Sequence, residues 1–557
     1  MKKLALSAFA FSALLCGCFF EDSSKKSYNE NIINVDNTGT YSMPQEFQKK
    51  DAYLVCYNDS EFEKDSSKDS YFCEESEYST QIAAENSFRS TNIIENEEKN
   101  EEKAESFFNR PKRIDYIQEP FDFKLVPASE ARTVSGSLPD YTGDTADFFL
   151  DDKYDYKKVK ATKKEDGKHC RVWYYKDSSI ENPSDSIFKE LADWFDKIFE
   201  KETELLCSNV PTRNYQNIIS VSESTKINIL VYDIFDDYEE TVKNNGGTYG
   251  FFAPKDMYSE TKEEIYSNKC EMFYIDTYFL TEKDSNGNKV LSHTMVSTLA
   301  HEFQHMLGFI QKGLNYNSRE GSGETWYTEM LSMLTEEFFV KYLEIDELSG
   351  PQARIPYYLS GNRYGFSNWR NSDSIVYNNY ANAYAFGAYL TRNFGGIELV
   401  QRIFRNRYTD KQSIVSAVKD SGYDYDDFSE LLALFSAVQI YTSDSNHISL
   451  NKSGKKDIFS YPKVDLSVFY SILLPKKNED EFNSILDRIY PVQDINEKSS
   501  FTTNDGSEYL TYKGPIYYRQ NPNIKIDYTG SFIVHLGNIN EFTINNNSGL
   551  KYYILFK

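Results

Sequence analysis

Two histidines and a glutamate within five residues carry the clearest chemistry in this chain. Residues 301–305 read His-Glu-Phe-Gln-His. On an α-helix, residues four apart lie one above the other on the same face, so His301 and His305 can bind one metal ion. Glu302, one position further round the turn, is placed to reach a water on that metal. With 6 His in 557 residues, this pattern is expected by chance only roughly 0.005 times. The segment therefore predicts a metal centre for hydrolysis, with Zn²⁺ as the cofactor.

The segment around the motif has the pattern of a buried helix, predicted over residues 293–311. Its apolar positions occur on most sides of the helix: Met295, Val296, Leu299, Ala300, Phe303, Met306, Leu307, Phe309 and Ile310. A helix that is apolar nearly all round lies at the centre of its domain. Ser292 precedes the helix and is a good residue to cap it. His293 lies two turns before His301, and we interpret it as solvent-facing, with an orienting role as the alternative.

A catalytic zinc site needs a third protein ligand and one open position for water. Glu329 and Glu324 are the two candidates downstream. Glu329 falls on the inner face of a helix predicted over 325–344, where an unpaired buried charge is costly and a metal would compensate it. Glu324 follows a Gly-Ser-Gly segment and is more simply a charge at a helix start. We predict Glu329 as the third ligand and keep Glu324 as the alternative.

The N-terminus predicts export and lipid anchoring. A short basic start is followed by an apolar stretch over residues 4–15, which is typical of a secretory signal and too short to span a bilayer. Leu-Cys-Gly-Cys at 15–18 resembles the bacterial lipoprotein signal, in which a small residue precedes the lipidated cysteine. Cys18 fits that pattern better than Cys16. We therefore predict a signal peptide over 1–17, lipidation at Cys18, and an anchor in a bacterial membrane, either the outer membrane or the cell surface.

The formal charge of −25 argues against a nucleic-acid partner, which would need a basic surface. Residues 18–113 are rich in Ser, Asn, Glu and Lys, and such composition buries too little apolar surface to fold. We predict that this segment is a polar tether. An exported protein can form disulfides. Cys56 and Cys73 are close enough in sequence to form one, and one further pair is expected among the three later cysteines: Cys170, Cys207 and Cys270.

The order of the patterned segments predicts an α+β fold. Strands are expected at 170–175, 226–234, 248–253 and 271–280 before the motif helix, and helices follow it at 325–344, 381–393, 397–406, 411–419 and 427–441. We predict a catalytic domain over 114–445. A change in character past residue 445 predicts a β-rich C-terminal domain over 446–557, of the sandwich type.

The two helices also carry a family resemblance. Together with the motif at 301–305, the segment 325–334 (Thr-Trp-Tyr-Thr-Glu-Met-Leu-Ser-Met-Leu) resembles the hyicolysin-type (M30) zinc metallopeptidases of the gluzincin group. Their pattern at the third ligand is T-W-x-N-E-G-x-A. This chain departs from it at three positions: Thr328, Met330 and Ser332. The resemblance implies a thermolysin-like zincin fold with a glutamate ligand at Glu329. Thermolysin-type relatives place an Asp four residues later to orient a histidine, but Met333 stands there, so this role has no residue.

A second resemblance lies downstream, at 384–388 (Tyr-Ala-Phe-Gly-Ala). It is similar to the Y-x-x-G-A motif of related aminopeptidases, whose tyrosine donates a hydrogen bond to the oxyanion. The resemblance implies this role for Tyr384, with Tyr380 as the alternative, and core packing is the competing interpretation of both.

Together these features predict a zinc endopeptidase acting on polypeptide substrates. Water on the metal attacks the peptide carbonyl, with Glu302 as general base. The substrate is expected to add to a sheet edge, for which the strand at 271–280 is the candidate. The alternative function is a non-catalytic, adhesin-like surface lipoprotein that retains the peptidase fold. Asp256 is interpreted as a turn residue, with calcium binding as the alternative.

Overall fold

The computed structural model describes residues 31–75, 113–114, 138–441, 466, 469–486 and 498–557, except 152–155, 177–179, 216, 220, 223–224, 235–246, 260–264, 319–320, 347–348, 371–374 and 503–506. Asn31–Lys557 forms one compact unit. The predicted signal at 1–17, Cys18 and most of the segment 76–137 lie outside the described residues. Among the residues that are described, no helix is long and apolar enough to cross a membrane.

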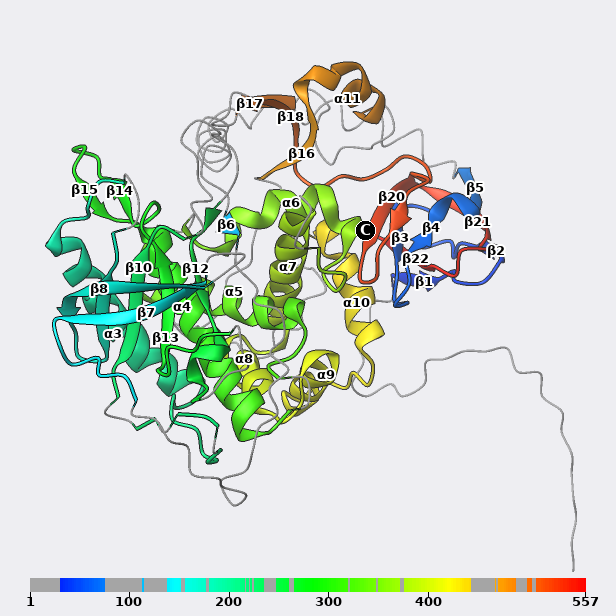
Figure 1. Cartoon of the computed structure of the whole chain (residues 1–557). Coiled ribbons are helices and arrows are strands. Elements are labelled where there is room, and N and C mark those ends of the chain that lie inside the picture. Colours follow the sequence, from blue (N-terminus) through cyan, green and yellow to red (C-terminus); the bar gives the residue numbers. More distant parts are fainter. Residues whose placement is uncertain are drawn as a thin grey trace, which may run out of the picture. The chain divides into compact units, whose positions relative to one another are not determined.

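A six-stranded mixed sheet precedes the motif helix (Figure 1). Its order is β12 (Gly250–Phe252), β13 (Met272–Asp276), β10 (Ile227–Tyr232), β9 (Cys170–Tyr174), β8 (Tyr156–Asp166) and β7 (Thr145–Asp151). The β9, β10 and β13 strands run parallel, while β12, β8 and β7 join antiparallel. The parallel strands are buried along their length, as expected for a sheet covered on both faces.

One face of this sheet packs on two helices. These are α3 (Asp185–Leu205) and α4 (His293–Gly308), which carries the motif. Phe195 of α3 contacts both Phe273 of the sheet and Phe303 of α4, with ring centroids 5.4 and 5.3 Å away. The other face buries its own cluster, which includes Trp173, Leu230 and Tyr274. The motif helix is thus held against the centre of the sheet.

Short elements link the sheet to the helices. They are β6 (Arg113–Ile114) with β11 (Gly247–Thr248), the 3₁₀ turn η4 (Pro254–Met257), and the hairpin of β14 (Thr281–Lys283) and β15 (Lys289–Leu291). After α4 the chain continues as a π-helix, η5 (Phe309–Asn315). Its Lys312 donates to the carbonyl oxygens of Ile403, Asn406 and Tyr408 at 2.8, 2.6 and 2.6 Å. This buried side chain joins the end of the motif helix to the end of α8 (Ile397–Arg405).

The helical half follows. It consists of α5 (Thr325–Tyr342), η7 (Pro351–Arg354), α6 (Ile355–Gly361), η8 (Asn362–Tyr364), α7 (Val376–Phe394), α8 (Ile397–Arg405), α9 (Asp410–Asp420), α10 (Phe428–Ser436) and η9 (Val438–Tyr441). The predicted α+β order, with a sheet first and helices after the motif, is confirmed. The predicted edge strand is wrong: β13 lies between β12 and β10, and β12 is the edge. The β12 strand is only three residues long and begins with Gly250, so its hydrophobic pattern was too weak to identify it as the edge.

Strands from both ends of the described chain form a second β region. One sheet has the order β1 (Ile32–Asn34), β22 (Lys551–Phe556), β3 (Ala52–Tyr57) and β20 (Ser531–Gly537), and the other β2 (Gly39–Ser42), β21 (Ile539–Asn545) and β5 (Ser70–Glu75). Both sheets contribute to one core, which includes Leu54, Phe542 and Ile554. Figure 1 shows the blue N-terminal strands beside the red C-terminal ones.

The prediction of a polar tether is therefore wrong for residues 31–75. Their mean composition is polar, but short apolar segments such as β3 bury side chains against partners more than 450 positions later in the sequence. The proposed Cys56–Cys73 bridge is also absent, because the two residues lie on strands of different sheets and both are free thiols. The described Cys170, Cys207 and Cys270 are free as well. The domain boundaries near 113 and 445 stay predictions.

The remaining C-terminal elements form a small sheet. Its strands are β16 (Tyr470–Pro475), β18 (Glu508–Lys513) and β17 (Lys498–Thr502), with η11 (Lys476–Asn478) and α11 (Glu479–Leu486) between them. The β16 strand packs on α6 of the helical half. A further pair, β19 (Lys525–Ile526) and β4 (Lys64–Asp65), leads through η1 (Ser66–Lys68) to the second β region.

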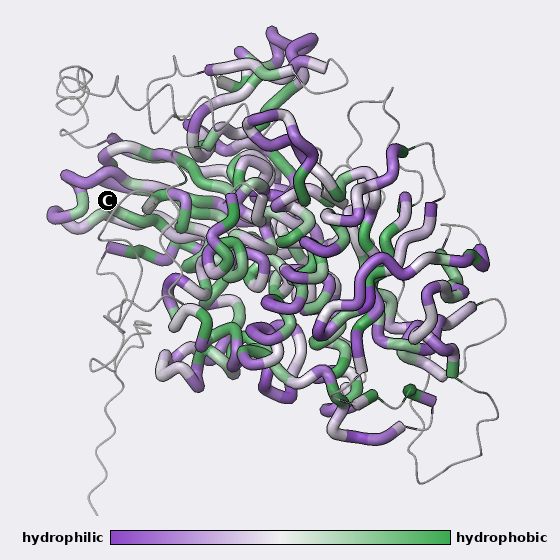
Figure 2. The backbone as a smooth tube through the Cα atoms, turned by 90° about the vertical axis from the view of Figure 1, so that its left-hand side faces the viewer, coloured by the Kyte–Doolittle hydropathy of each residue, from purple (hydrophilic) through white to green (hydrophobic). Residues whose placement is uncertain are grey.

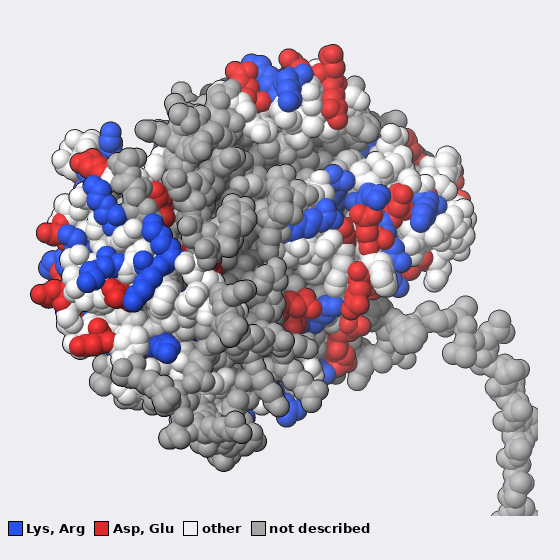
Figure 3. Space-filling model, viewed as in Figure 1, with Lys and Arg blue, Asp and Glu red and all other residues white. Residues whose placement is uncertain are grey.

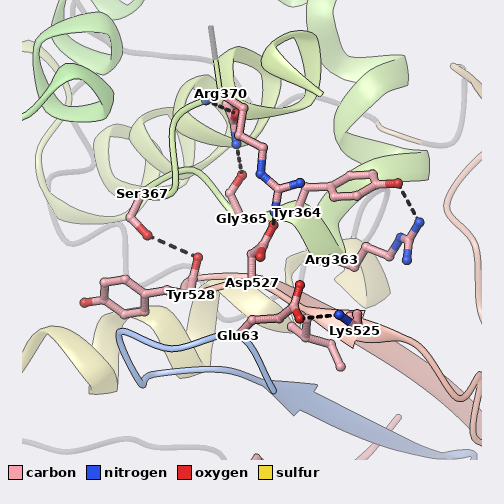
Figure 4. Close-up of polar contacts among 12 residues, drawn as sticks. Glu63, Arg363, Tyr364, Gly365, Ser367, Arg370, Lys525, Asp527 and Tyr528 are labelled. Atoms are coloured by element: carbon pink, nitrogen blue, oxygen red, sulfur yellow. Dashed lines mark hydrogen bonds and ion pairs between the residues drawn. The ribbon is translucent and has the colours of Figure 1, made fainter. Parts of the chain in front are cut away.

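A close contact joins the helical half to the C-terminal strands (Figure 4). Arg370 donates to Asp527 at 2.6 Å, and the backbone N–H of Asp527 donates to the carbonyl of Arg363 at 3.0 Å. Gly365 has φ +59°, and a Cβ there would lie 2.1 Å from the carbonyl oxygen of Tyr528. The two segments thus approach to backbone contact, which joins η8 and the residues after it to the chain between β19 and β20.

Hydropathy and charge follow this arrangement. In Figure 2 the buried strands and helices are mostly green, while purple segments concentrate at turns and outer elements. On the face seen in Figure 3, Lys and Arg side chains over α3, β7 and β8 are interspersed with Asp and Glu, as in the 3.1 Å pair of Lys158 and Asp147.

Candidate metal centre

The packing of α4 against α5 brings three side chains together. His301 and Glu329 are almost fully buried, and His305 is partly exposed. The Nε2 atoms of His301 and His305 lie 3.0 Å apart, and the carboxylate oxygens of Glu329 lie 3.2 Å from the first and 3.4 Å from the second. Four ligands about 2.0–2.1 Å from a tetrahedral zinc ion are themselves about 3.3 Å apart. The observed spacing fits a single metal ion bound by His301, His305 and Glu329, the group that the sequence predicted.

The electrostatics of this group also favour a cation. Oε2 of Glu329 is buried and accepts no hydrogen bond, although a buried charge requires compensation. Burial works against the charge of Glu329, but His305 and His301 beside it hold the pKa of its carboxyl below the usual range. A metal ion at this point would satisfy the orphaned oxygen and both ring nitrogens at once.

A carboxylate behind His301 fixes the orientation of its ring. Oε1 of Glu336 lies 2.5 Å from Nδ1 of His301, and both side chains are buried. The hydroxyl oxygen of Ser297 lies 3.4 Å from Oε2 of Glu336. If Nδ1 carries the proton and donates it to Glu336, the lone pair of Nε2 is directed at the metal position.

His305 has a corresponding partner. Its Nδ1 lies 3.2 Å from the hydroxyl of Ser332, and that hydroxyl donates to the side-chain oxygen of Gln304. Since the hydroxyl proton is used on Gln304, Ser332 is left to accept from Nδ1 of His305. If Nδ1 is protonated on both rings, the two histidines present Nε2 lone pairs to the same point, and two lone pairs 3.0 Å apart repel unless a cation lies between them.

Sequence reasoning missed Glu336. It considered only the position four residues after Glu329, where Met333 is a buried core residue. Position 336 is seven residues after Glu329, two turns later on the same face of α5. That spacing was the available signal, since α5 places Glu329, Ser332 and Glu336 along one side.

The alternative ligand Glu324 lies elsewhere. It is the residue before α5, and its carboxylate accepts a 2.6 Å hydrogen bond from the indole of Trp326. Glu302 is 1 % exposed and lies on α4 between the two histidines. The helix thus holds this carboxylate beside the group without making it a ligand.

Tyr384 is fully buried, and its hydroxyl lies beside Glu337 and Arg392. Its role as a donor to an oxyanion stays a prediction. Burial, with Glu337 beside it, raises the pKa of Tyr384 well above its usual value. The alternative, Tyr380, packs against Trp369 with ring centroids 4.6 Å apart, and the guanidinium of Arg354 lies 4.5 Å from its ring centroid.

The structure also describes three other residues that the sequence singled out, Ser292, His293 and Asp256. Ser292 is at the helix start, but its side chain makes no capping hydrogen bond. His293 is half-buried and accepts from the backbone N–H of Asp346 at 3.3 Å, so it neither faces solvent freely nor orients His301. Asp256 lies in the 3₁₀ turn η4, which confirms the turn interpretation, and there it is fully buried and accepts from Tyr274 and from the N–H of Asn268 at 2.6 and 2.8 Å.

Comparison with known proteins agrees with this geometry. A family model described as Peptidase M30 matches residues 158–479, more than half of the chain. One curated relative is the neutral metalloprotease ShpI of Staphylococcus hyicus, which is 27 % identical over 260 residues. The match covers 46 % of this chain and 52 % of the relative, so the chain spans about half the length of the curated relative that it matches. The family match includes the three residues of the candidate metal centre, His301, His305 and Glu329.

Proposed function

This chain belongs to the peptidase M30 family, and we propose that it is a zinc endopeptidase that hydrolyses polypeptide substrates. The observation that carries the proposal is the convergence of two Nε2 atoms and a buried carboxylate within 3.0–3.4 Å. The partners at both Nδ1 atoms support it, because they direct both lone pairs at one point.

The chain's own residues have separate roles in this proposal. His301, His305 and Glu329 hold the ion, and Glu336 and Ser332 keep the two imidazoles in the required orientation. When bound, zinc supplies Lewis-acid polarisation and makes water acidic enough to be deprotonated near neutral pH. Glu302 takes a proton from the attacking water and delivers it to the nitrogen of the leaving amine. Its low exposure supports this role, since burial keeps a carboxylate from being fully solvated.

The decisive experiment combines metal content with proteolysis. Purified full-length protein is expected to contain close to one zinc per chain and to cleave an unfolded protein such as casein. The Glu302→Gln variant should retain zinc and lose cleavage, because it keeps the ligands and removes the base. Glu324→Ala serves as the matched control and should retain both. Absence of bound zinc would contradict the proposal, and zinc-loaded protein that cleaves nothing would favour the non-catalytic binding alternative.

We further propose a thermolysin-like, gluzincin type of fold for the catalytic part. It is supported by the order of a mixed sheet, a central motif helix and a helix bearing the third ligand. For the second β region we propose a sandwich, supported by the core that its two sheets share.

Export and anchoring through Cys18 are proposed from the N-terminal sequence. The expected result is incorporation of labelled palmitate in a bacterial host. Cys18→Ser should abolish the label and release the protein from the membrane fraction, while Cys16→Ser should change neither. Equal labelling of both variants would refute the assignment.

A further inference from the structure

A cavity of about 840 Å³ lies between the helical half and the small C-terminal sheet. Its walls come from η7, α6 and the start of α7 on one side, and from β16, β17 and β18 on the other. The hairpin of β14 and the start of α4 close a third side. This volume is in the range of sites that bind ligands of several residues or rings.

Aromatic and aliphatic side chains face the cavity from both walls. On the helical wall, Tyr357 and Tyr377 are stacked with ring centroids 5.6 Å apart. On the strand wall, Phe501 and Tyr509 are stacked at 5.3 Å, next to Ile472. Tyr357, Tyr377, Ile472 and Tyr509 are all only half-buried, so their rings and methyl groups remain accessible from the cavity. Large apolar groups held on two opposed walls mark a recognition site more than a packing defect.

Two arginines place positive charge on the helical wall. Arg354 lies over the ring of Tyr380 at 4.5 Å, and Arg363 lies over the ring of Tyr364 at 4.4 Å. Stacking fixes each guanidinium plane, and both arginines line the cavity. A fixed guanidinium is suited to donate hydrogen bonds to carboxylate or peptide carbonyl oxygens.

The cavity extends to Glu336, on the Nδ1 side of His301 and away from the candidate metal position. Glu336 lines it, and the same carboxylate lies 2.5 Å from Nδ1 of His301. Ser349, whose carbonyl accepts from Ser297 at 2.8 Å, lines it as well. Glu336 thus both lines the cavity and contacts a candidate metal ligand.

We propose that this cavity binds an extended segment of the substrate polypeptide through aromatic or large aliphatic side chains. The inference rests on the proposed function and names its substrate class. The occupant follows from the lining, since apolar side chains fit the two stacked tyrosine and phenylalanine walls and the peptide backbone offers carbonyl oxygens to the arginines. Part of the strand wall, including Phe501 and Tyr509, lies beyond the region of the family match. Tyr357, Tyr377 and Ile472 lie within that region, so the cavity combines matched and unmatched parts of the chain.

Binding can be tested apart from catalysis with the full chain carrying Glu302→Gln. The probe is a fluorescent peptide in which Phe and Leu alternate with Ser, compared with its counterpart in which Ser replaces Phe and Leu. Fluorescence anisotropy should show tighter binding of the Phe/Leu peptide. Adding Tyr377→Ala on one wall, or Ile472→Ser on the other, should weaken that binding about tenfold or more, as for central apolar contacts in interfaces. Phe62→Ala is the matched control, because Phe62 is 76 % exposed and does not line the cavity.

Equal binding of the two peptides, or equal effects of the wall variants and the control, would overturn the proposal. Should a wall variant fail to fold, a photoreactive version of the Phe/Leu peptide can be cross-linked to the Glu302→Gln chain. Cross-links at 357–378 or 472–509 support the site, and cross-links confined to other regions refute it. Peptide binding without any cleavage by the unaltered protein would remove the proposed function and leave the cavity's ligand preference standing. Cleavage by the unaltered protein together with equal binding of the two peptides would refute the cavity's ligand preference and leave the proposed function standing.

Discussion

Replacing Glu336 tests the most specific feature of the candidate metal centre. Its Oε1 lies 2.5 Å from Nδ1 of His301, with both groups buried. A hydrogen bond to a charged acceptor contributes about 1.5–3 kcal/mol, and one to a neutral acceptor about 0.5–1.5 kcal/mol. Glu336→Gln keeps an acceptor of the same shape and removes the charge. The difference of about 1.4 kcal/mol corresponds to about tenfold weaker zinc binding. Glu336→Ala removes the acceptor and should approach about a hundredfold, the upper range for such orienting partners.

The assay is competition for zinc against a chromophoric chelator, with circular dichroism to establish that each variant is folded. Thr335→Ser is the matched control. It changes the neighbouring buried position of α5, whose hydroxyl bonds only to the carbonyl of Leu331 at 2.9 Å. Ser332→Ala should cost less than Glu336→Ala, because it removes a neutral partner from His305. If folded Glu336→Gln and Glu336→Ala both bind zinc as tightly as the control, the carboxylate does not orient His301 and the reasoning from tautomers fails.

Three predictions concern stability. Burial raises the pKa of Glu271 to about 8, and Oε2 accepts a hydrogen bond from Asn209 at 3.2 Å. Between about pH 4.5 and 8 the folded state therefore binds more protons than the unfolded state, so the free energy of unfolding falls as pH rises through this window. Glu271→Gln should flatten the dependence and be more stable by about 2–4 kcal/mol at pH 8, as measured by urea unfolding at several pH values, and an unchanged slope would contradict the assignment. Asp69→Ala should lower the free energy of unfolding by about 3 kcal/mol. Asp69 accepts hydrogen bonds from Asn547, Ser548 and Tyr552 at 2.7, 2.8 and 2.7 Å, and so joins the N-terminal strands to the C-terminal ones. A loss near zero would show that these hydrogen bonds do not stabilise the second β region. Gly365→Ala should destabilise by more than about 2 kcal/mol, because its Cβ would meet the carbonyl of Tyr528, and a thermal midpoint equal to that of the unaltered protein would show that the two segments do not touch as described.

The features that sequence predicted well are those that one segment specifies by itself. The nearly all-apolar pattern of α4 identified a central helix, and the inner position of Glu329 on α5 identified a residue that lies with His301 and His305 in the candidate metal centre. Both depend on the helical period, which is local. The mixed sheet followed by helices was predictable for the same reason, since each element has its own hydrophobic pattern.

The features that it missed depend on partners distant in the chain. The β3 strand reads as an isolated apolar fragment in a polar segment, and it becomes a central strand only through β20 and β22, which pair with it on either side. The position of Tyr384 was likewise decided by where α7 meets α5, which no local pattern encodes. Glu336 is the intermediate case, because its spacing was visible but its partner, His301, lies on another helix.

The packing of α7 explains why the segment 384–388 carries a glycine. A Cβ at Gly387 would lie 2.7 Å from Cγ of Met330 and 3.0 Å from Leu334, so only glycine lets α7 approach α5 at this point. Met330 stands where the family pattern has a small residue, and the bulk added on α5 is accommodated at this glycine of α7. The side of α5 that bears Glu329, Ser332 and Glu336 is therefore supported from behind by this contact. On this account Tyr-Ala-Phe-Gly-Ala positions the ligand helix, and substituting Gly387 by Ala should weaken zinc binding without removing any ligand.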